Sequence, residues 1–297
     1  MSFRCDRARF HGERRPAHAR ARVLLIALAL LASALMLSTV QTNRVLRITA
    51  DPNNLPFSND KLEGFENRIA TLIAQELNAK IEYTWRAQRR GFFRETLKEN
   101  NADLILGVPT DFERALTTQP YYRSAYAFVR RKDRAAKIQS FDDPALRTLR
   151  IGVHLVGDDG ANTPPAHALA TRGIVTNVVG FTLYGDYAEP NPPARLIEAV
   201  AKGDIDVAIA WGPLAGYSAR QQKVALEVTP VPAPFDSFAL PFAFDISLGV
   251  RKRDKELCDE LNAVLSRRSA DIEKILDEYG VPRVSTPQRE RAEEVSR

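Results

Sequence analysis

Cysteine is scarce in this chain of 297 residues, which contains only Cys5 and Cys258. Cys5 precedes the apolar segment near the N-terminus, so it is not a lipoprotein-processing cysteine, which would follow such a segment. Cys258 is alone in the rest of the chain. The sequence therefore excludes an intramolecular disulfide in that part and zinc sites built on C-x-x-C pairs.

Beyond the N-terminal segment, the chain also has no net charge. Residues 1–40 contain seven arginines against Asp6 and Glu13, whereas residues 41–297 contain 35 basic and 35 acidic side chains. A nucleic-acid-binding domain typically presents a clustered basic face. The neutral body therefore disfavours DNA or RNA as a partner. The rest of the composition, with 44% hydrophobic and 8% aromatic residues, is that of a globular protein.

Motifs of catalysis and metal binding are missing as well. The chain has no G-x-S-x-G nucleophile turn, no phosphate-binding loop and no H-E-x-x-H motif. After residue 40 the only histidines are His154 and His167. We therefore expect a protein that is not an enzyme, with no catalytic residues, no metal site and no covalently bound cofactor.

The N-terminal segment has the layout of an export signal. Four arginines between residues 14 and 22 precede the apolar stretch Val23–Val40, and Ala32–Ala34 matches an A-x-A cleavage site. This predicts a signal peptide over residues 1–40. The alternative is an uncleaved membrane anchor, because the 18 residues of Val23–Val40 come close to the roughly 20 apolar residues that a spanning helix needs. Either reading places the body outside the cytoplasm, with membrane contact only through an uncleaved leader.

From about residue 44, short apolar runs alternate with amphipathic segments. Gly64–Ala79 carries apolar residues at spacings of three and four, which predicts a helix. Val45–Ala50, Lys80–Trp85 and Ala102–Val108 are typical of buried strands. The other expected elements are a short helix at Phe92–Glu99, strands at Tyr121–Arg130, Val224–Val231 and Phe244–Val250, and closing helices at Asp254–Arg267 and Ala270–Gly280. Alternating strands and helices predict parallel α/β sheets.

An internal repeat with an offset of 103 residues divides the body. The tripeptide Leu-Arg-Ile at 46–48 recurs at 149–151, and Asp103, which precedes an apolar run, recurs as Asp206. The repeat predicts two lobes with one topology, each a mostly parallel sheet flanked by helices. The run at Tyr121–Arg130 is expected to cross between them, and Val224–Val231 together with the stretch around Phe244–Val250 is expected to form the return to lobe one.

The predicted architecture is an α/β clamshell. Lobe one is expected at 41–128 plus 236–284 and lobe two at 129–235, with a frayed tail at 285–297. Ligands bind beyond the carboxyl ends of the strands in open parallel sheets. The cleft between the lobes is therefore the expected binding site.

Candidate contact residues gather at the predicted strand ends. They offer flat aromatic faces, neutral amides, one cation and one histidine: Asn53, Asn54, Tyr121, Tyr122, Arg123, His154, Trp211 and Tyr217. Such a lining suits a polar ligand or a protein loop held without chemistry. Packing at a hinge or in the core is the alternative for Tyr121, Tyr122 and Trp211, and a purely structural role for His154.

Several long stretches of the amino-acid sequence resemble those of known protein families. The layout resembles periplasmic solute-binding proteins of the amino-acid-receptor type, with the type II binding-protein fold. These stretches most resemble the J proteins of bacterial methanol-oxidation systems, which are binding proteins associated with quinoprotein dehydrogenases. The resemblance covers nearly all of residues 45–282 and rests on 48–59, 64–92, 116–129, 151–174, 184–217 and 240–252.

The resemblance implies a periplasmic protein whose partner is a methanol or alcohol dehydrogenase that uses pyrroloquinoline quinone (PQQ) with calcium or a lanthanide. PQQ and the metal would belong to that partner. The chain departs from the family in two places. Family members often carry cysteines at the positions of Thr49 and Ala102. Amino-acid receptors place a carboxylate-binding arginine about 11 residues before the residue matching Tyr122, where this chain has Asp111, with Arg114 just beyond. Asp111 is therefore expected among the binding residues, where its charge would repel the carboxylate of an amino acid.

Three functions stay open at this point. The first is a periplasmic accessory factor that assists a PQQ-dependent dehydrogenase by binding the enzyme, a cofactor or an unfolded segment in the cleft. The second is a receptor that delivers a small polar solute, other than an amino acid, to an ABC importer. The third is a catalytic descendant such as a dehydratase, which would need carboxylates and His154 to converge with perturbed titration.

Overall fold

The structure is a computed structural model that describes residues 44–88, 91–134, 137–156, 161–182, 189–232 and 241–285. The predicted leader, and the predicted tail apart from residue 285, lie outside these residues. The described residues all belong to one compact unit. No helix in the described ranges combines the length and the apolar character that crossing a bilayer requires.

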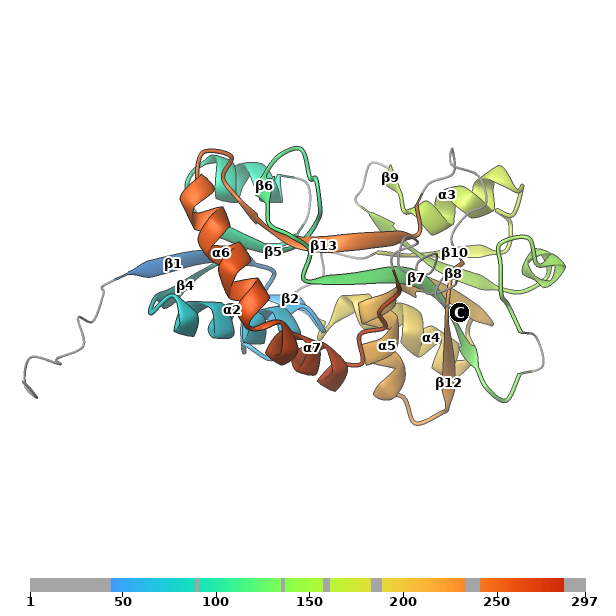
Figure 1. Ribbon diagram of the computed structural model, residues 1–297. Helices are drawn as coiled ribbons and strands as arrows, with labels where there is room; N and C mark the ends of the chain where they lie inside the picture. Colours follow the sequence, from blue (N-terminus) through green and yellow to red (C-terminus); the bar gives the residue numbers. More distant parts are fainter. Residues whose placement is uncertain are drawn as a thin grey trace, which may run out of the picture. The chain divides into compact units, whose positions relative to one another are not determined.

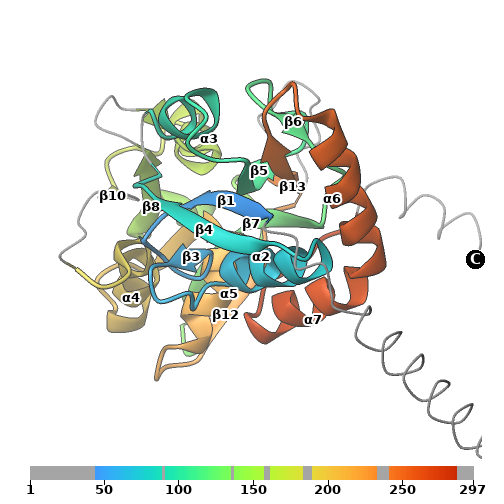
Figure 2. The same ribbon diagram turned by 90° about the vertical axis from the view of Figure 1, so that its left-hand side faces the viewer.

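The first lobe is built around strand β1 (Val45–Ala50), which the sequence predicts. β1 pairs in parallel with β4 (Lys80–Trp85) and with β5 (Leu104–Pro109). Helix α2 (Phe65–Glu76) lies against this sheet (Figure 2). It begins after Gly64, whose backbone N–H donates to the Asn67 side chain at 3.1 Å and so satisfies one helix-end donor.

The second lobe repeats this plan around β8 (Ile151–Val156). β8 pairs in parallel with β10 (Val178–Thr182) and with β11 (Val207–Trp211). Helices α3 (Pro164–Thr171), α4 (Arg195–Lys202) and α5 (Gly212–Arg220) belong to this lobe. The remaining short elements are β2 (Asn53–Asn54), β3 (Ser58–Asn59), β6 (Leu116–Thr117), β9 (Ala161–Asn162), a π-helical turn at Arg94–Lys98 and 3₁₀ turns at Pro144–Arg147 and Pro192–Ala194.

Two strands connect the sheets of the two lobes (Figure 1). β7 (Tyr122–Arg131) pairs antiparallel with β13 (Ala243–Val250) through Tyr122–Ala125 and with β11 through Tyr126–Arg130. β13 also pairs with β5, which gives the strand order β10-β8-β11-β7-β13-β5-β1-β4. The predicted crossing strand and the return near Phe244 are therefore confirmed.

The predicted strand at Val224–Val231 has a different role from the one expected. It contains β12 (Leu226–Pro230), which pairs with β7 between Ala127 and Arg131 and so stays in the second lobe instead of returning to the first. The antiparallel strands β7, β12 and β13 make the sheet mixed, with a parallel group of three strands in each lobe. The predicted lobe boundaries stay predictions, because β7 runs through one of them and the other falls outside the described residues.

The 103-residue repeat has a structural basis. The Arg47 guanidinium binds Asp103 at 2.6 Å and the carbonyl of Asn100 at 2.8 Å. At the matching place in lobe two, Arg150 binds Asp206 at 3.2 Å and the carbonyl of residue 203 at 2.7 Å. In both lobes the same aspartate also accepts from the arginine backbone N–H. This contact joins the start of the central strand to the turn before its parallel neighbour.

The two copies of this contact differ in burial, so we expect different effects on stability. The Asp103 side chain is 13% exposed and binds Arg251 as well as Arg47, whereas Asp206 is 24% exposed and, among the described residues, pairs with Arg150. Asp103→Asn should cost about 2–3 kcal/mol, because Arg47 loses its charge partner and Arg251 loses one of its two partners, and Asp206→Asn about 1 kcal/mol. Urea unfolding of both variants at pH 7 measures this, and equal losses would contradict it.

Two closing helices complete the first lobe. α6 (Lys255–Arg267) and α7 (Ser269–Glu278) form close to the residues predicted for them and pack against α2. Leu261, Val264 and Leu276 are fully buried in the core that α2 and β1 share. After α7, the chain passes next to α5, where a Cβ on Gly216 would meet the carbonyl oxygen of residue 280. The glycine therefore allows a close backbone approach.

Candidate ligand-binding cleft

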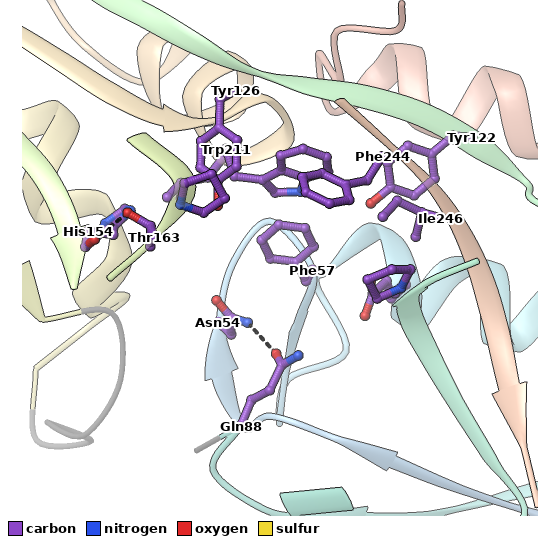
Figure 3. A pocket seen from close by; sticks show the side chains of 15 residues that line it. Asn54, Phe57, Gln88, Tyr122, Tyr126, His154, Thr163, Trp211, Phe244 and Ile246 are labelled. Atoms are coloured by element: carbon purple, nitrogen blue, oxygen red, sulfur yellow. Dashed lines mark hydrogen bonds between the residues drawn. The ribbon is translucent and has the colours of Figure 1, made fainter. Parts of the chain in front are cut away.

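A cavity of about 350 Å³ lies where the carboxyl ends of strands from the two lobes meet, as the sequence predicts. Its described walls are mainly aromatic and apolar, with a few amide, hydroxyl and ionisable groups. The lining residues are Asn54, Phe57, Glu66, Gln88, Gly107, Pro109, Tyr122, Tyr126, His154, Thr163, Pro164, Trp211, Leu214, Phe244 and Ile246. Figure 3 shows Tyr126, Trp211, Phe244 and Tyr122 in a row above Phe57, with Asn54 and Gln88 below.

Four of the predicted contact residues line this cavity: Asn54, Tyr122, His154 and Trp211. Asn54 is only 4% exposed, and its amide donates to the Gln88 side chain at 3.1 Å (Figure 3). This hydrogen bond fixes the orientation of both amides. The Gln88 amide is thereby a second polar group of the cavity, held from the loop that follows β4.

Trp211 forms part of the cavity wall and packs against its aromatic neighbours. It ends β11, and its indole makes edge-to-face contacts with Tyr126, at a ring-centre distance of 5.4 Å, and with Phe244, at 5.9 Å. Tyr126 comes from β7 and Phe244 from β13, so both crossing strands hold the indole. The packing interpretation of Trp211 is therefore confirmed, and ligand contact by the indole stays a prediction for a residue that lines the cavity.

His154 is held as a neutral imidazole. It is 5% exposed, and its Nε2 lies 3.1 Å from the carbonyl oxygen of Pro193. Because a carbonyl only accepts, Nε2 carries the proton, which leaves Nδ1 as an acceptor. Burial lowers the pKa of His154 to about 4, although the hydrogen bond to Pro193 raises it slightly. The histidine thus offers the cavity no positive charge at neutral pH.

Glu66 is the one carboxyl group among the described lining residues, and sequence reasoning missed it. It lies in the first turn of α2, half-buried, and burial raises its pKa to about 8. Its carboxyl group occupies the space that a Cβ on Gly107 would take, and Gly107 has a φ of +74°. In the sequence Glu66 belongs to the polar face of an amphipathic helix, and only the distant glycine makes room for it in the cleft.

Phe57, Tyr126 and Phe244 were also missed as wall residues. Phe57 precedes α2 and packs against Phe65 at a ring-centre distance of 5.4 Å. Tyr126 and Phe244 face the cavity from the crossing strands, whose runs read as buried strand interior in the sequence. For Tyr126 and Phe244, the signal that was available was their position on the crossing strands, between the two lobes.

Two predicted residues near the cleft lie outside its lining. Asn53 connects the lobes, because its amide donates to the carbonyl of Glu189 at 2.7 Å and its oxygen accepts from the N–H of Asn191 at 2.9 Å. Asp111 is exposed, with a left-handed φ of 63°, and its N–H donates to the Thr117 hydroxyl. Asp111 therefore cannot act in the cavity as the like-charged group in place of a carboxylate-binding arginine.

The other three predicted residues make contacts outside the described lining of the cavity. Tyr121 contacts the edge of the Tyr122 ring, and its hydroxyl is buried near the backbone of Gly107. Arg123 pairs with Asp245 at 2.7 Å on β13. Tyr217, on α5, stacks on Tyr279 at the end of α7, with ring centres 5.8 Å apart. We find none of the three among the described residues that line the cavity.

No arginine or lysine is among the described lining residues of the cavity. Searched over the described ranges, the chain brings no three His, Cys, Asp or Glu side chains together as metal ligands. The cleft can therefore offer flat aromatic faces, two amides, a neutral imidazole and one carboxyl group. These groups suit apolar, aromatic, hydrogen-bonding or cationic chemistry in a bound group.

Common amino acids should bind poorly. An α-carboxylate placed in this cavity would meet no described cation and would lie in the same cavity as Glu66, so its desolvation would remain uncompensated. Titration calorimetry with the twenty amino acids should show no dissociation constant below about 1 mM. One amino acid bound at micromolar concentration would contradict this reading of the cleft.

A two-lobed α/β fold with a cleft at the strand ends is that of a solute-binding protein. The model of bacterial extracellular solute-binding proteins, family 3, matches residues 46–282, and the chain belongs to this family.

Within this family, the chain is similar to J proteins. Protein MoxJ of Methylorubrum extorquens strain AM1 is 34% identical over 238 residues, which is 76% of this chain and 78% of that protein. Protein MoxJ of Paracoccus denitrificans is 31% identical over 246 residues, 80% of this chain and 88% of that protein. Among solved structures, the periplasmic binding protein XoxJ from Methylobacterium extorquens AM1 is 37% identical, covers 81% of this chain and 100% of its own, and has a TM-score of 0.66. The resemblance to J proteins is confirmed.

Proposed function

We propose that the chain is a periplasmic, non-enzymatic accessory factor of a PQQ-dependent methanol or alcohol dehydrogenase, and that its cleft binds a segment of that enzyme during assembly or activation. Similarity to MoxJ proteins and to the periplasmic binding protein XoxJ supports the system and the location. The observation that carries the proposal is the row of aromatic side chains from Tyr126 to Tyr122, in a cleft with no described cation.

Aromatic residues suit the binding of a protein segment. Each buries a large area, and tyrosine and tryptophan keep a polar group that directs the contact. The cavity of about 350 Å³ accommodates a few side chains, not a folded domain. The bound part would therefore be an extended or loosely folded stretch, with the neighbouring rim contacting the rest.

The cofactors of the proposed partner fit the cleft poorly. PQQ carries several carboxylates, which need cations or a dense set of donors, and the described lining supplies one carboxyl group and no cation. Calcium takes six to eight oxygen ligands, and lanthanides likewise require several oxygens. The described lining has no acidic cluster of that size. We therefore assign the cleft to the enzyme itself, and PQQ and its metal to the partner.

A second candidate function is that of a receptor for an ABC importer. Glu66 favours it, because a half-buried carboxyl group whose pKa of about 8 keeps it mainly protonated at neutral pH suits a small organic solute that accepts a hydrogen bond and packs on the aromatic faces. A receptor of this kind would show thermal stabilisation by such a solute at millimolar or lower concentration. An accessory factor would act without any free solute.

Deletion of the gene in its host tests the proposal. Dehydrogenase activity in the periplasmic fraction should fall in the deletion strain and return when the wild-type gene is restored. Transcript levels of the dehydrogenase serve as the control, because an expression defect would also lower activity. Unchanged activity, together with loss of uptake of an organic solute, would favour the receptor instead.

A further inference from the structure

A second concave site lies on the first lobe, and none of its lining residues belongs to the cleft. This basic pocket has a volume of about 630 Å³, within the range of small-molecule sites. It is formed by the π-helical turn, the β5–β6 loop and the turn after β13, and β6 and β13 are paired. Its lining residues are Phe93, Arg94, Leu97, Lys98, Glu113, Arg114, Arg251, Lys252 and Arg253.

Three of the six basic residues in the pocket already have charge partners. Arg251 pairs with Asp103 at 2.8 Å and with Asp254 at 2.6 Å. Arg94 pairs with Glu95 at 3.3 Å, and Arg253 lies 3.7 Å from Asp254.

The other three basic residues are exposed and unpaired. Lys98, Arg114 and Lys252 form no ion pair within the part of the chain that the structure describes, and each comes from a different segment. Glu113 is the single acidic residue of the lining. The unpaired groups therefore leave the pocket with a surplus of positive charge.

This surplus is not a consequence of composition. Residues 41–297 contain equal numbers of basic and acidic side chains, so a random surface patch would be close to neutral. Cations that converge on one concavity repel each other, and the low-dielectric wall strengthens that repulsion. An anion bound among them would remove the repulsion and gain charge-assisted hydrogen bonds.

The shape and the apolar part of the pocket indicate the kind of anion. Protein partners mostly bind on flat surfaces with an apolar centre, whereas small molecules bind in concave sites. Phe93 is half-buried in the wall and is held by an edge-to-face contact with Phe112 at 5.2 Å. Leu97, 1% exposed, lies beneath. An apolar molecular body can cover Phe93 while charged groups reach the three cations.

We infer that the basic pocket binds a small organic polyanion, whose carboxylate or phosphate groups pair with Lys98, Arg114 and Lys252 while its apolar body covers Phe93. This inference is independent of the proposed function, because no residue of the cleft takes part. It assigns the protein a second ligand, an anion, which the described lining of the cleft, without arginine or lysine, does not suit.

Titration calorimetry of the full chain at low salt, with benzene-1,3,5-tricarboxylate as the probe, tests the inference. Binding with a dissociation constant below about 1 mM is expected. It should weaken as salt rises to 0.2 M, because exposed charges are then screened beyond about 7–8 Å. Inorganic triphosphate, which lacks an apolar body, should bind more weakly than the tricarboxylate.

Two variants of equal net charge separate the pocket from bulk charge. Lys98→Gln/Arg114→Gln/Lys252→Gln should weaken binding at least about tenfold, since each lost charge-assisted hydrogen bond matters. The control Lys61→Gln/Lys80→Gln/Lys223→Gln removes three exposed lysines elsewhere and should leave binding unchanged. Equal weakening by the control, no binding at 5 mM probe, or binding of hexaglutamate but not of the tricarboxylate would overturn the inference.

Discussion

Glu66→Gln should make the protein markedly more stable at pH 8 to 9. Burial raises the pKa of Glu66 from 4.5 to about 8, so the folded state keeps a proton that the unfolded state has lost between these values. The stability of the wild type therefore falls as pH rises through this interval. At about 1.4 kcal/mol for each pH unit, the loss reaches up to about 5 kcal/mol. The glutamine side chain has no proton to lose in this pH range, so the stability of the variant does not fall in this way.

Urea unfolding of the wild type and of Glu66→Gln from pH 4.5 to pH 9 measures the difference. The two stabilities should diverge with rising pH and stay apart above pH 8. Glu82→Gln, at an exposed position of β4, is the matched control and should run parallel to the wild type. If the free energy of unfolding of Glu66→Gln also ran parallel to that of the wild type over this pH range, the carboxyl group would be solvated and the prediction would be wrong.

His154→Gln should remove a loss of stability on the acid side. Burial lowers the pKa of His154 from 6.5 to about 4, so between these values the unfolded state binds a proton that the folded state refuses. Wild-type stability therefore falls as pH drops from 6.5 to 4, by up to about 3 kcal/mol. A glutamine amide can still donate to the carbonyl of Pro193, which preserves the hydrogen bond.

Thermal unfolding at intervals between pH 7 and pH 4 checks this prediction. The variant should lose less stability than the wild type, and His167→Gln provides the control for a histidine outside the cleft lining. Carboxylates such as Asp103 and Asp206, whose pKa values lie below the ordinary range, lose their contribution only at lower pH and in both proteins alike. A wild type insensitive to pH between 6.5 and 4 would contradict the account.

Local patterns in the sequence predict most of the fold. The apolar run of β1 and the helical spacing of α2 depend on neighbouring residues alone, and both elements form where expected. The 103-residue repeat is visible because the same Arg–Asp contact is required in each lobe. β12 was assigned a wrong role, because its pairing with β7 depends on a contact between distant segments.

The sequence predicted the position of the cleft better than it predicted the residues that line it. Strand ends indicate where ligands bind, which identified Asn54, Tyr122, His154 and Trp211. Glu66 enters the cavity only because Gly107 lacks a Cβ, and no spacing along the chain reveals that contact. Asp111 was assigned to the binding residues by counting from Tyr122, but its side chain is exposed and is not among the described lining residues.

Retention of the dehydrogenase by the tagged protein in its own host tests the central claim most directly. The wild type should retain the PQQ-dependent enzyme, and Trp211→Ala should weaken retention by roughly 1–3 kcal/mol, because the indole is the proposed anchor in the cleft. Trp85→Ala, which alters the other tryptophan outside the cleft lining, is the matched control once both variants are shown to be folded. Equal retention by the wild type and folded Trp211→Ala, or no retention by the wild type, would contradict the account.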